Sequence, residues 1–149
     1  MRGRRTFSVV AVAVAVAPRS FGRFGGSLIA PNEVNGTIYA FGPGGRVTVV
    51  ARPNAPRGGD IGVESLGFAP AGARTAYLAD LGAPGAPTEG TDSLLTLNRT
   101  FAPGELVAVT EGGAITLAVR CARVCTSRRI AEGPEATHAE GHVVFARAP

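Results

Sequence analysis

Two cysteines and two histidines near the end of the chain have the spacing of a metal site. Three residues separate Cys121 from Cys125, twelve more precede His138, and a further three precede His142. Two thiolates and two imidazoles form the ligand set of many tetrahedral zinc sites. The spacing therefore raises the hypothesis of a small zinc-binding regulatory protein.

The residues between these ligands favour another interpretation. Arg129 and Glu135 stand where a zinc finger needs an aromatic residue and a leucine in its core, and Gly133-Pro134 falls where its helix should run. The three residues between the cysteines instead suit a hairpin loop, which brings the two Cα atoms to the roughly 4.4 to 6.8 Å that a disulfide needs. We therefore predict a disulfide between Cys121 and Cys125, which persists in an oxidising, extracytoplasmic setting. The zinc site and histidines exposed in a loop stay open as alternatives.

Acidic side chains recur directly after short apolar runs and before turns. Glu33, Asp80 and Glu111 occupy such equivalent places, and Glu64 precedes another apolar run. If these runs are strands around one axis, the carboxylates meet at one mouth of a channel, where hard oxygen ligands hold calcium. The pattern predicts a calcium site at Glu33, Asp80 and Glu111. The alternative is that these acids cap turns and face water.

No established catalytic motif accompanies these groups. The sequence contains no Gly-x-Ser-x-Gly elbow, phosphate-binding loop, His-Glu-x-x-His pair or EF-hand pattern. A Ser-His-Asp hydrolase is therefore unsupported and no catalytic residue is predicted, while the question of whether the chain is an enzyme stays open.

Short apolar or alternating runs must position these groups. The 149 residues include 21 glycines and 11 prolines, which is the composition of a β protein rich in turns. No window shows the apolar face of a helix. We expect strands at 28–30, 37–41, 46–51, 65–69, 76–80, 93–97, 106–110, 115–121, 126–130 and 143–146.

One pattern occurs twice along the chain. The stretch from Leu28 to Ile38 aligns with the stretch from Leu106 to Ile115, with the two leucines 78 positions apart. Independently, residues 66–69 align with residues 143–146 at an offset of 77. Another strand, loop and strand lie between, so the offset indicates two units of about 39 residues, near the roughly 40 to 45 of a four-stranded propeller blade.

The run from Gly62 to Pro70, followed by residues 76–80 and 92–97, resembles the blade rhythm of six-bladed propellers of the NHL-repeat and gluconolactonase-like kind. In those families a strand that ends in a small residue and proline leads to a second strand ending in an aspartate near the central channel. A metal in that channel polarises a lactone or ester carbonyl.

This resemblance covers Phe21 to Ala146 and implies an all-β fold of antiparallel propeller-type blades, about three to four units. Six blades would need about 240 residues. The resemblance therefore implies an incomplete ring, either a fragment or a part that self-assembles to complete a propeller.

The first seventeen residues admit two interpretations. Arg2, Arg4 and Arg5 before the apolar run 7–17 resemble a signal peptide, whereas the alternation of valine and alanine in residues 10–17 suits a first strand. We therefore divide the chain into residues 1–17, a signal-like segment or first strand, and residues 18–149, a propeller-like repeat domain. Because a membrane helix needs about 20 apolar residues, no transmembrane segment is expected.

The charge pattern limits the classes of partner that the chain is expected to bind. The net charge is +4 and all 15 basic residues are arginine, but no basic stripe with interleaved aromatics is present, so nucleic-acid binding is not expected. The leading hypothesis is a secreted or extracytoplasmic, non-catalytic propeller-type protein or fragment that binds a small molecule or protein at its loop face. The alternatives are a calcium-dependent hydrolase of the lactonase or esterase kind, with Glu33, Asp80 and Glu111 around the ion, and the small zinc-binding protein.

Overall fold

The computed structural model describes residues 13–53, 62–80, 93–110, 115–132 and 139–147. These ranges contain strands and two short 3-10 helices and no α-helix, which confirms the expected all-β class. The elements are β1 (Ala15–Val16), η1 (Gly22–Phe24), β2 (Leu28–Pro31), β3 (Ile38–Phe41), η2 (Pro43–Gly45), β4 (Val47–Ala51), β5 (Val63–Phe68), β6 (Ala73–Asp80), β7 (Ser93–Asn98), β8 (Leu106–Thr110), β9 (Ile115–Cys121), β10 (Cys125–Glu132) and β11 (Ala139–Arg147).

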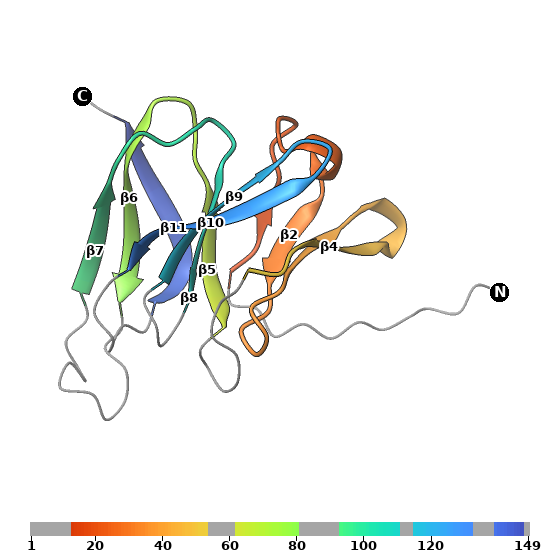
Figure 1. Ribbon diagram of the computed structural model, residues 1–149, viewed down its shortest axis with the longest axis horizontal. Helices are drawn as coiled ribbons and strands as arrows, with labels where there is room; N and C mark the ends of the chain where they lie inside the picture. Colours follow the sequence, from red (N-terminus) through yellow and green to blue (C-terminus); the bar gives the residue numbers. More distant parts are fainter. Residues whose placement is uncertain (1–12, 54–61, 81–92, 111–114, 133–138, 148–149) are drawn as a thin grey trace.

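The strands form two sheets of unequal size (Figure 1). The smaller sheet is a four-stranded antiparallel meander in the order β1-β2-β3-β4. The larger has seven strands in the order β10-β9-β8-β5-β11-β6-β7 and curls upon itself. Its neighbours are antiparallel except β5 and β11, which run parallel. Antiparallel pairing therefore dominates, as expected.

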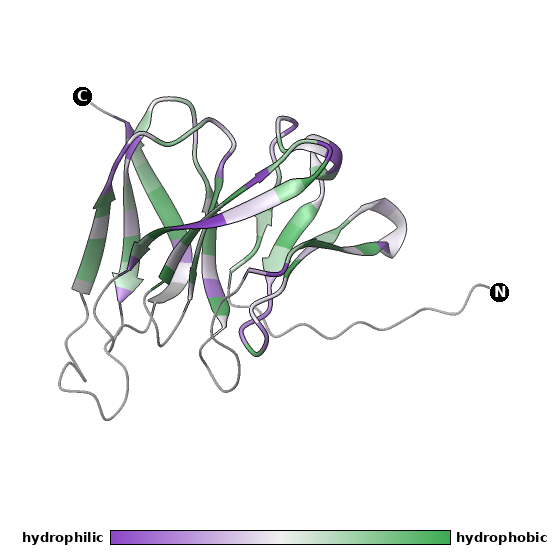
Figure 2. Cartoon of the chain, viewed as in Figure 1, coloured by the Kyte–Doolittle hydropathy of each residue, from purple (hydrophilic) through white to green (hydrophobic). Residues whose placement is uncertain are grey.

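Alternation along the sequence sets which face of a strand is buried. In β6 the side chains of Ala76, Leu78 and Asp80 are buried, while those of Tyr77 and Ala79 are partly exposed. This period of two is the pattern of a strand with one face against a core. Figure 2 shows the consequence, with hydrophobic residues concentrated along the inner strands and hydrophilic ones along much of β10.

Two clusters of buried side chains make up the core. The first lies between the four-stranded sheet and β5, β8 and β9, and its largest fully buried members are Phe21, Ile29, Ile38, Leu66 and Leu106. The second lies within the curl of the larger sheet, where side chains of β6, β7 and β11 pack against β8; it includes Leu78, Phe101, Val107, Val109 and Val143.

Strand β8 belongs to both clusters. Leu106 and Ala108 face the first cluster, and Val107 and Val109 face the second. All five residues of β8 are buried. Burial on both faces explains why the sequence of this strand is a continuous apolar run and does not alternate between apolar and polar residues. Strand β8 therefore contributes buried side chains to both cores, one from each of its faces.

The two stretches that match in sequence are both antiparallel hairpins. Leu28 pairs with Phe41 between β2 and β3, and Leu106 pairs with Val119 between β8 and β9. Each residue of the second pair lies 78 positions after the corresponding residue of the first pair. The other match, 66–69 with 143–146, falls on β5 and β11, which are direct neighbours in one sheet. The number of blades is not confirmed, because the described strands form one four-stranded and one seven-stranded sheet.

Within the expected first strand, residues 10–17, the described part contains β1, which pairs with β2 through Ala15 and Ile29. In the ranges that the structure describes, no helix has the length and hydrophobicity to cross a membrane.

Candidate ligand-binding site

Two of the three predicted calcium ligands lie at the same end of the molecule. Val63, at the start of β5, pairs with Thr110 at the end of β8. Asp80, at the end of β6, pairs with the first residue of β11. Because β11 runs parallel to β5, the starts of these two strands lie at the same end of the sheet. The turn that carries Glu33 packs here too, because the Glu33 carbonyl lies directly against Gly62. Glu111 lies outside the described residues.

These acids do not form a complete metal site by themselves. Asp80 is buried and Glu33 is half-buried. Among the described residues, no group of three or more histidines, cysteines, aspartates or glutamates is close enough to hold an ion. The calcium site therefore stays a prediction that depends on Glu111.

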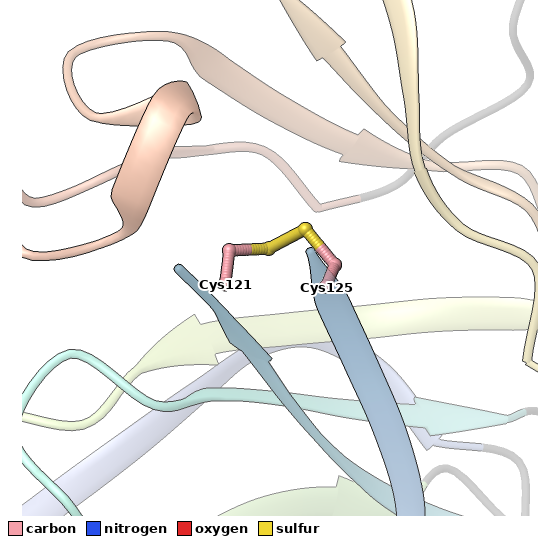
Figure 3. Close-up of a disulfide and its surroundings, with 2 residues drawn as sticks. All are labelled: Cys121 and Cys125. Carbon is pink, nitrogen blue, oxygen red and sulfur yellow. A yellow bond between two sulfur atoms is a disulfide. The ribbon is translucent and has the colours of Figure 1, made fainter. Parts of the chain in front are cut away.

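The two cysteines are joined in a disulfide, as predicted (Figure 3). Cys121 ends β9, Cys125 begins β10, and the two residues are directly paired across the hairpin with an S–S distance of 2.04 Å. Cys121 is buried in the first core cluster. The bond therefore closes the β9–β10 hairpin and anchors its tip to the core.

The disulfide also bears on the zinc hypothesis. Zinc binds thiolates, and both sulfur atoms are already bonded to each other. His142 is exposed on β11, three strands from β9 in the sheet, which corresponds to about 14 Å at the usual strand spacing. His138 lies outside the described residues. In this state the four residues do not make a zinc site.

Another acid, Glu105, lies in a buried ion cluster directly before β8. Its side chain has 0% exposure, and the carboxylate accepts a hydrogen bond of 2.6 Å from Arg120 Nε and forms an ion pair of 3.4 Å with Arg99 Nη1. The Arg99 guanidinium also stacks on Phe101, 5.1 Å from the ring centroid. Because the Glu105 side chain is fully buried, the cluster holds together the segments that carry Arg99, Glu105 and Arg120.

Two hollows lie beside the hairpin formed by β3 and β4. The first, about 460 Å³, lies between this hairpin and η1 and is lined by Arg23, Phe24, Ser27, Ala40, Gly42, Pro43, Arg46 and Thr48. The second, about 480 Å³, is lined by Tyr39, Gly45, Arg46, Val47, Thr48, Val49 and Arg52. Both hollows are lined by Arg46 and Thr48, so they adjoin each other along β4, the edge strand of the smaller sheet.

Arginines dominate the charge of both hollows. Arg23 and Arg46 line the first, and Arg46 and Arg52 line the second, whereas none of the described residues that line them is acidic. Arg23 lies over the Phe24 ring at 4.7 Å, which holds its guanidinium beside the hollow. Arg46 and Arg52 form no ion pair within the described part of the chain.

The turn between β3 and β4 depends on glycine. Gly44 and Gly45 have φ angles of 75° and 77°, a region that other residues rarely adopt. The Gly42 amide donates to the Arg46 carbonyl across this turn. The resulting loop returns the chain so that Arg46 lies where both hollows meet.

The polar side chains that line the hollows are mainly hydrogen-bond donors. Ser27, Thr48 and Tyr39 supply hydroxyl groups, but the described lining contains no histidine or carboxylate that could act as a general base. The arginines supply planar donors that recognise carboxylate, sulfate or phosphate oxygens in pairs. An anionic group is therefore the ligand that this lining recognises best.

Sequence reasoning did not identify this site. Its arginines come from two separate segments, η1 and the two ends of β4, and the apolar side chains between them belong to different elements. The alternation of β4 and the glycine-rich turn predicted the hairpin, but no local signal indicated that Arg23 would reach it. Comparisons with models of protein families, with curated proteins and with solved structures gave no match for this chain.

Proposed function

We propose that this chain is a non-catalytic, extracytoplasmic binding module that holds a small anionic ligand beside the β3–β4 hairpin. The observation that carries the proposal is the pair of arginine-lined hollows that share Arg46. Their volumes, about 460 and 480 Å³, fall within the range of roughly 300 to 1,000 Å³ usual for small-molecule sites.

The positive charge of the residues that line the hollows favours an anionic ligand over a neutral one. Three exposed arginines border the hollows, and without acids in the described lining, nothing there neutralises them. An arginine that must be desolvated to bind a neutral ligand loses hydrogen bonds with water, whereas an anion replaces those bonds with charge-assisted ones. A carboxylated, sulfated or phosphorylated small molecule, such as one unit of an acidic saccharide, fits this requirement.

The disulfide supports a location outside the cytoplasm. Disulfides persist in oxidising compartments and are rare where thiols are kept reduced. The bond between Cys121 and Cys125 also anchors the hairpin tip to a core cluster that includes Ile38 and Ala40 of β3. An oxidising setting therefore favours the form in which the β9–β10 hairpin and its neighbours are held together.

The test is an amide NMR titration of the full chain with a fully sulfated heparin disaccharide, with maltose as the uncharged counterpart. We expect shifts centred on η1, β3 and β4 for the sulfated probe and none for maltose. Arg46→Gln should weaken binding at least fivefold, about 1 kcal/mol. Arg128→Gln is the matched control, because Arg128 is exposed on β10 and lines neither hollow.

Two outcomes would contradict the proposal. If the Kd is weaker than roughly 10 mM both for the sulfated disaccharide and for a uronic-acid disaccharide, the hollows do not bind anionic saccharides. Equal weakening by Arg46→Gln and Arg128→Gln would show that the probe responds to the overall positive charge and not to the hollows.

A second candidate function is the calcium-dependent hydrolase that the propeller resemblance implies. It is supported by the positions of Glu33 and Asp80 at the same end of the molecule. Ca²⁺ takes six to eight oxygen ligands, so Glu111 and further oxygens must complete the site. Thermal melts with calcium or with a chelator test it: at 100 times Kd, calcium adds about 2.7 kcal/mol to stability. Identical melts would end this candidate.

A further inference from the structure

The four outermost strands of the two sheets differ in how they are protected from pairing with another chain. Natural sheets protect such edges with short strands, charged side chains and bulges. Strand β1 has only two residues. Strand β4 is flanked by Arg46 and Arg52 and has an extra residue, Val50, in its pairing with β3. Strand β10 carries Arg128 and Arg129 and also has a bulge.

Strand β7 has none of these features. Its six residues, Ser-Leu-Leu-Thr-Leu-Asn, include no charged side chain. It pairs with β6 over six consecutive residues without a bulge. It is the last strand of its sheet, so no described strand covers its outer edge (Figure 1), and Figure 2 shows it mostly in the colour of hydrophobic residues.

The two faces of β7 have different roles. Leu95 and Leu97 pack against the second core cluster, whereas Leu94, Thr96 and Asn98 are exposed, Leu94 by 61%. The inner leucines hold the strand flat against the curl of the sheet. The edge therefore presents a regular row of backbone donors and acceptors with an apolar side chain beside it.

We propose that two copies of this chain associate through β7, which pairs antiparallel with its counterpart about a two-fold axis. Antiparallel pairing of identical strands is self-complementary, as a closed dimer requires. Identical strands that carry charge would place like charges opposite each other, which is destabilising. Because β7 carries no charged side chain, it can pair with the same strand of a second copy without this repulsion.

The faces of the strand limit the possible registers of this pairing. Side chains directly opposite each other in an antiparallel pair lie on the same face, so Leu95 must face an inward residue of the other copy. A two-fold axis at Thr96 meets this condition, because it sets Leu95 opposite the partner's Leu97 and Thr96 opposite the partner's Thr96. The second core cluster would then continue across the interface.

The test measures the mass of the full chain in solution by light scattering and sedimentation, from roughly 1 μM to 1 mM. We expect a dimer for the natural sequence, and a monomer for Thr96→Lys, which sets two positive charges opposite each other. Thr126→Lys is the matched control, because Thr126 is an exposed threonine on the edge strand β10, and it should stay dimeric.

A second variant keeps the test valid if the lysine disturbs folding. Thr96→Cys should form an intermolecular disulfide under mild oxidation, whereas Val34→Cys, at an exposed position in the turn between β2 and β3, should not. A natural chain that stays monomeric at the highest concentration would overturn the proposal. A dimer that survives Thr96→Lys, or equal cross-linking of the two cysteine variants, would do the same.

Discussion

The buried carboxylate of Glu105 allows a sharp test of what holds the end of β5 to the start of β8 in the larger sheet. Glu105 lies where the end of β5 meets the start of β8: its carbonyl accepts a hydrogen bond from the Ala69 amide, and its carboxylate binds Arg99 and Arg120. Glu105→Gln keeps the size of the side chain and one acceptor oxygen but removes the charge. The variant therefore isolates the ionic part of the cluster.

The expected loss can be worked from the geometry. A hydrogen bond to a charged group contributes about 1.5–3 kcal/mol, and removal of one partner of a fully buried pair costs about 3–5 kcal/mol. The Arg120 side chain is 53% exposed and regains water when the carboxylate is lost, whereas Arg99 Nη1 is buried and keeps only the remaining glutamine oxygen as a neighbouring acceptor. We therefore expect the free energy of unfolding to fall by about 2 kcal/mol, within the range for a hydrogen bond to a charged group. For a domain of this size, this corresponds to a fall of roughly 4–8 °C in Tm.

The assay is thermal and urea denaturation followed by circular dichroism. Glu132→Gln is the matched control, because Glu132 pairs with Arg129 at 3.0 Å but its side chain is 63% exposed. An exposed pair of this kind contributes about 0.2–1 kcal/mol at most. If the two variants lose the same small amount of stability, the buried cluster does not stabilise the junction of β5 and β8, and the reasoning is refuted.

Two further predictions concern the hairpin tip and the parallel strand pair. The double change Cys121→Ala and Cys125→Ala should lower the free energy of unfolding by about 2 kcal/mol, which is the loop-closure entropy for so short a loop. Addition of reductant should lower the Tm of the natural chain and leave the Tm of the variant unchanged. If the fully reduced natural chain kept its Tm, this prediction would be wrong. Gly67→Ala should cost about 1–3 kcal/mol in urea denaturation, because a Cβ there would collide with the Val143 carbonyl between β5 and β11. Gly42→Ala is its control, with φ at −85° and the nearest atom at 3.8 Å, and equal stabilities of the two variants would contradict the prediction.

Much of the local structure was predictable because it depends on neighbours in sequence. The period of two and the turn residues between apolar runs predicted the positions of the strands, and the hairpin spacing predicted the disulfide between Cys121 and Cys125. These features need interactions over a few residues, which the residue types themselves specify. The same reasoning placed acidic residues at strand ends, and Glu33 and Asp80 lie at one end of the molecule.

The site was less predictable because its parts are distant in sequence. Arg23 and Arg46 line one hollow only because η1 packs beside the β3–β4 hairpin. The sequence pattern did not single out Glu105, because its burial between two arginines depends on where Arg99 and Arg120 lie in space. No pattern in the sequence records such distances.

The sequence by itself determined the all-β class, the strands and the paired cysteines, because these follow from side-chain alternation and turn chemistry. The tertiary structure alone decided the order of the strands, the parallel contact of β5 with β11, and the meeting of arginines from separate segments. The physical reason is the burial of β8 on both faces: its alternate side chains need two different layers of partners, and only the folded chain can supply them.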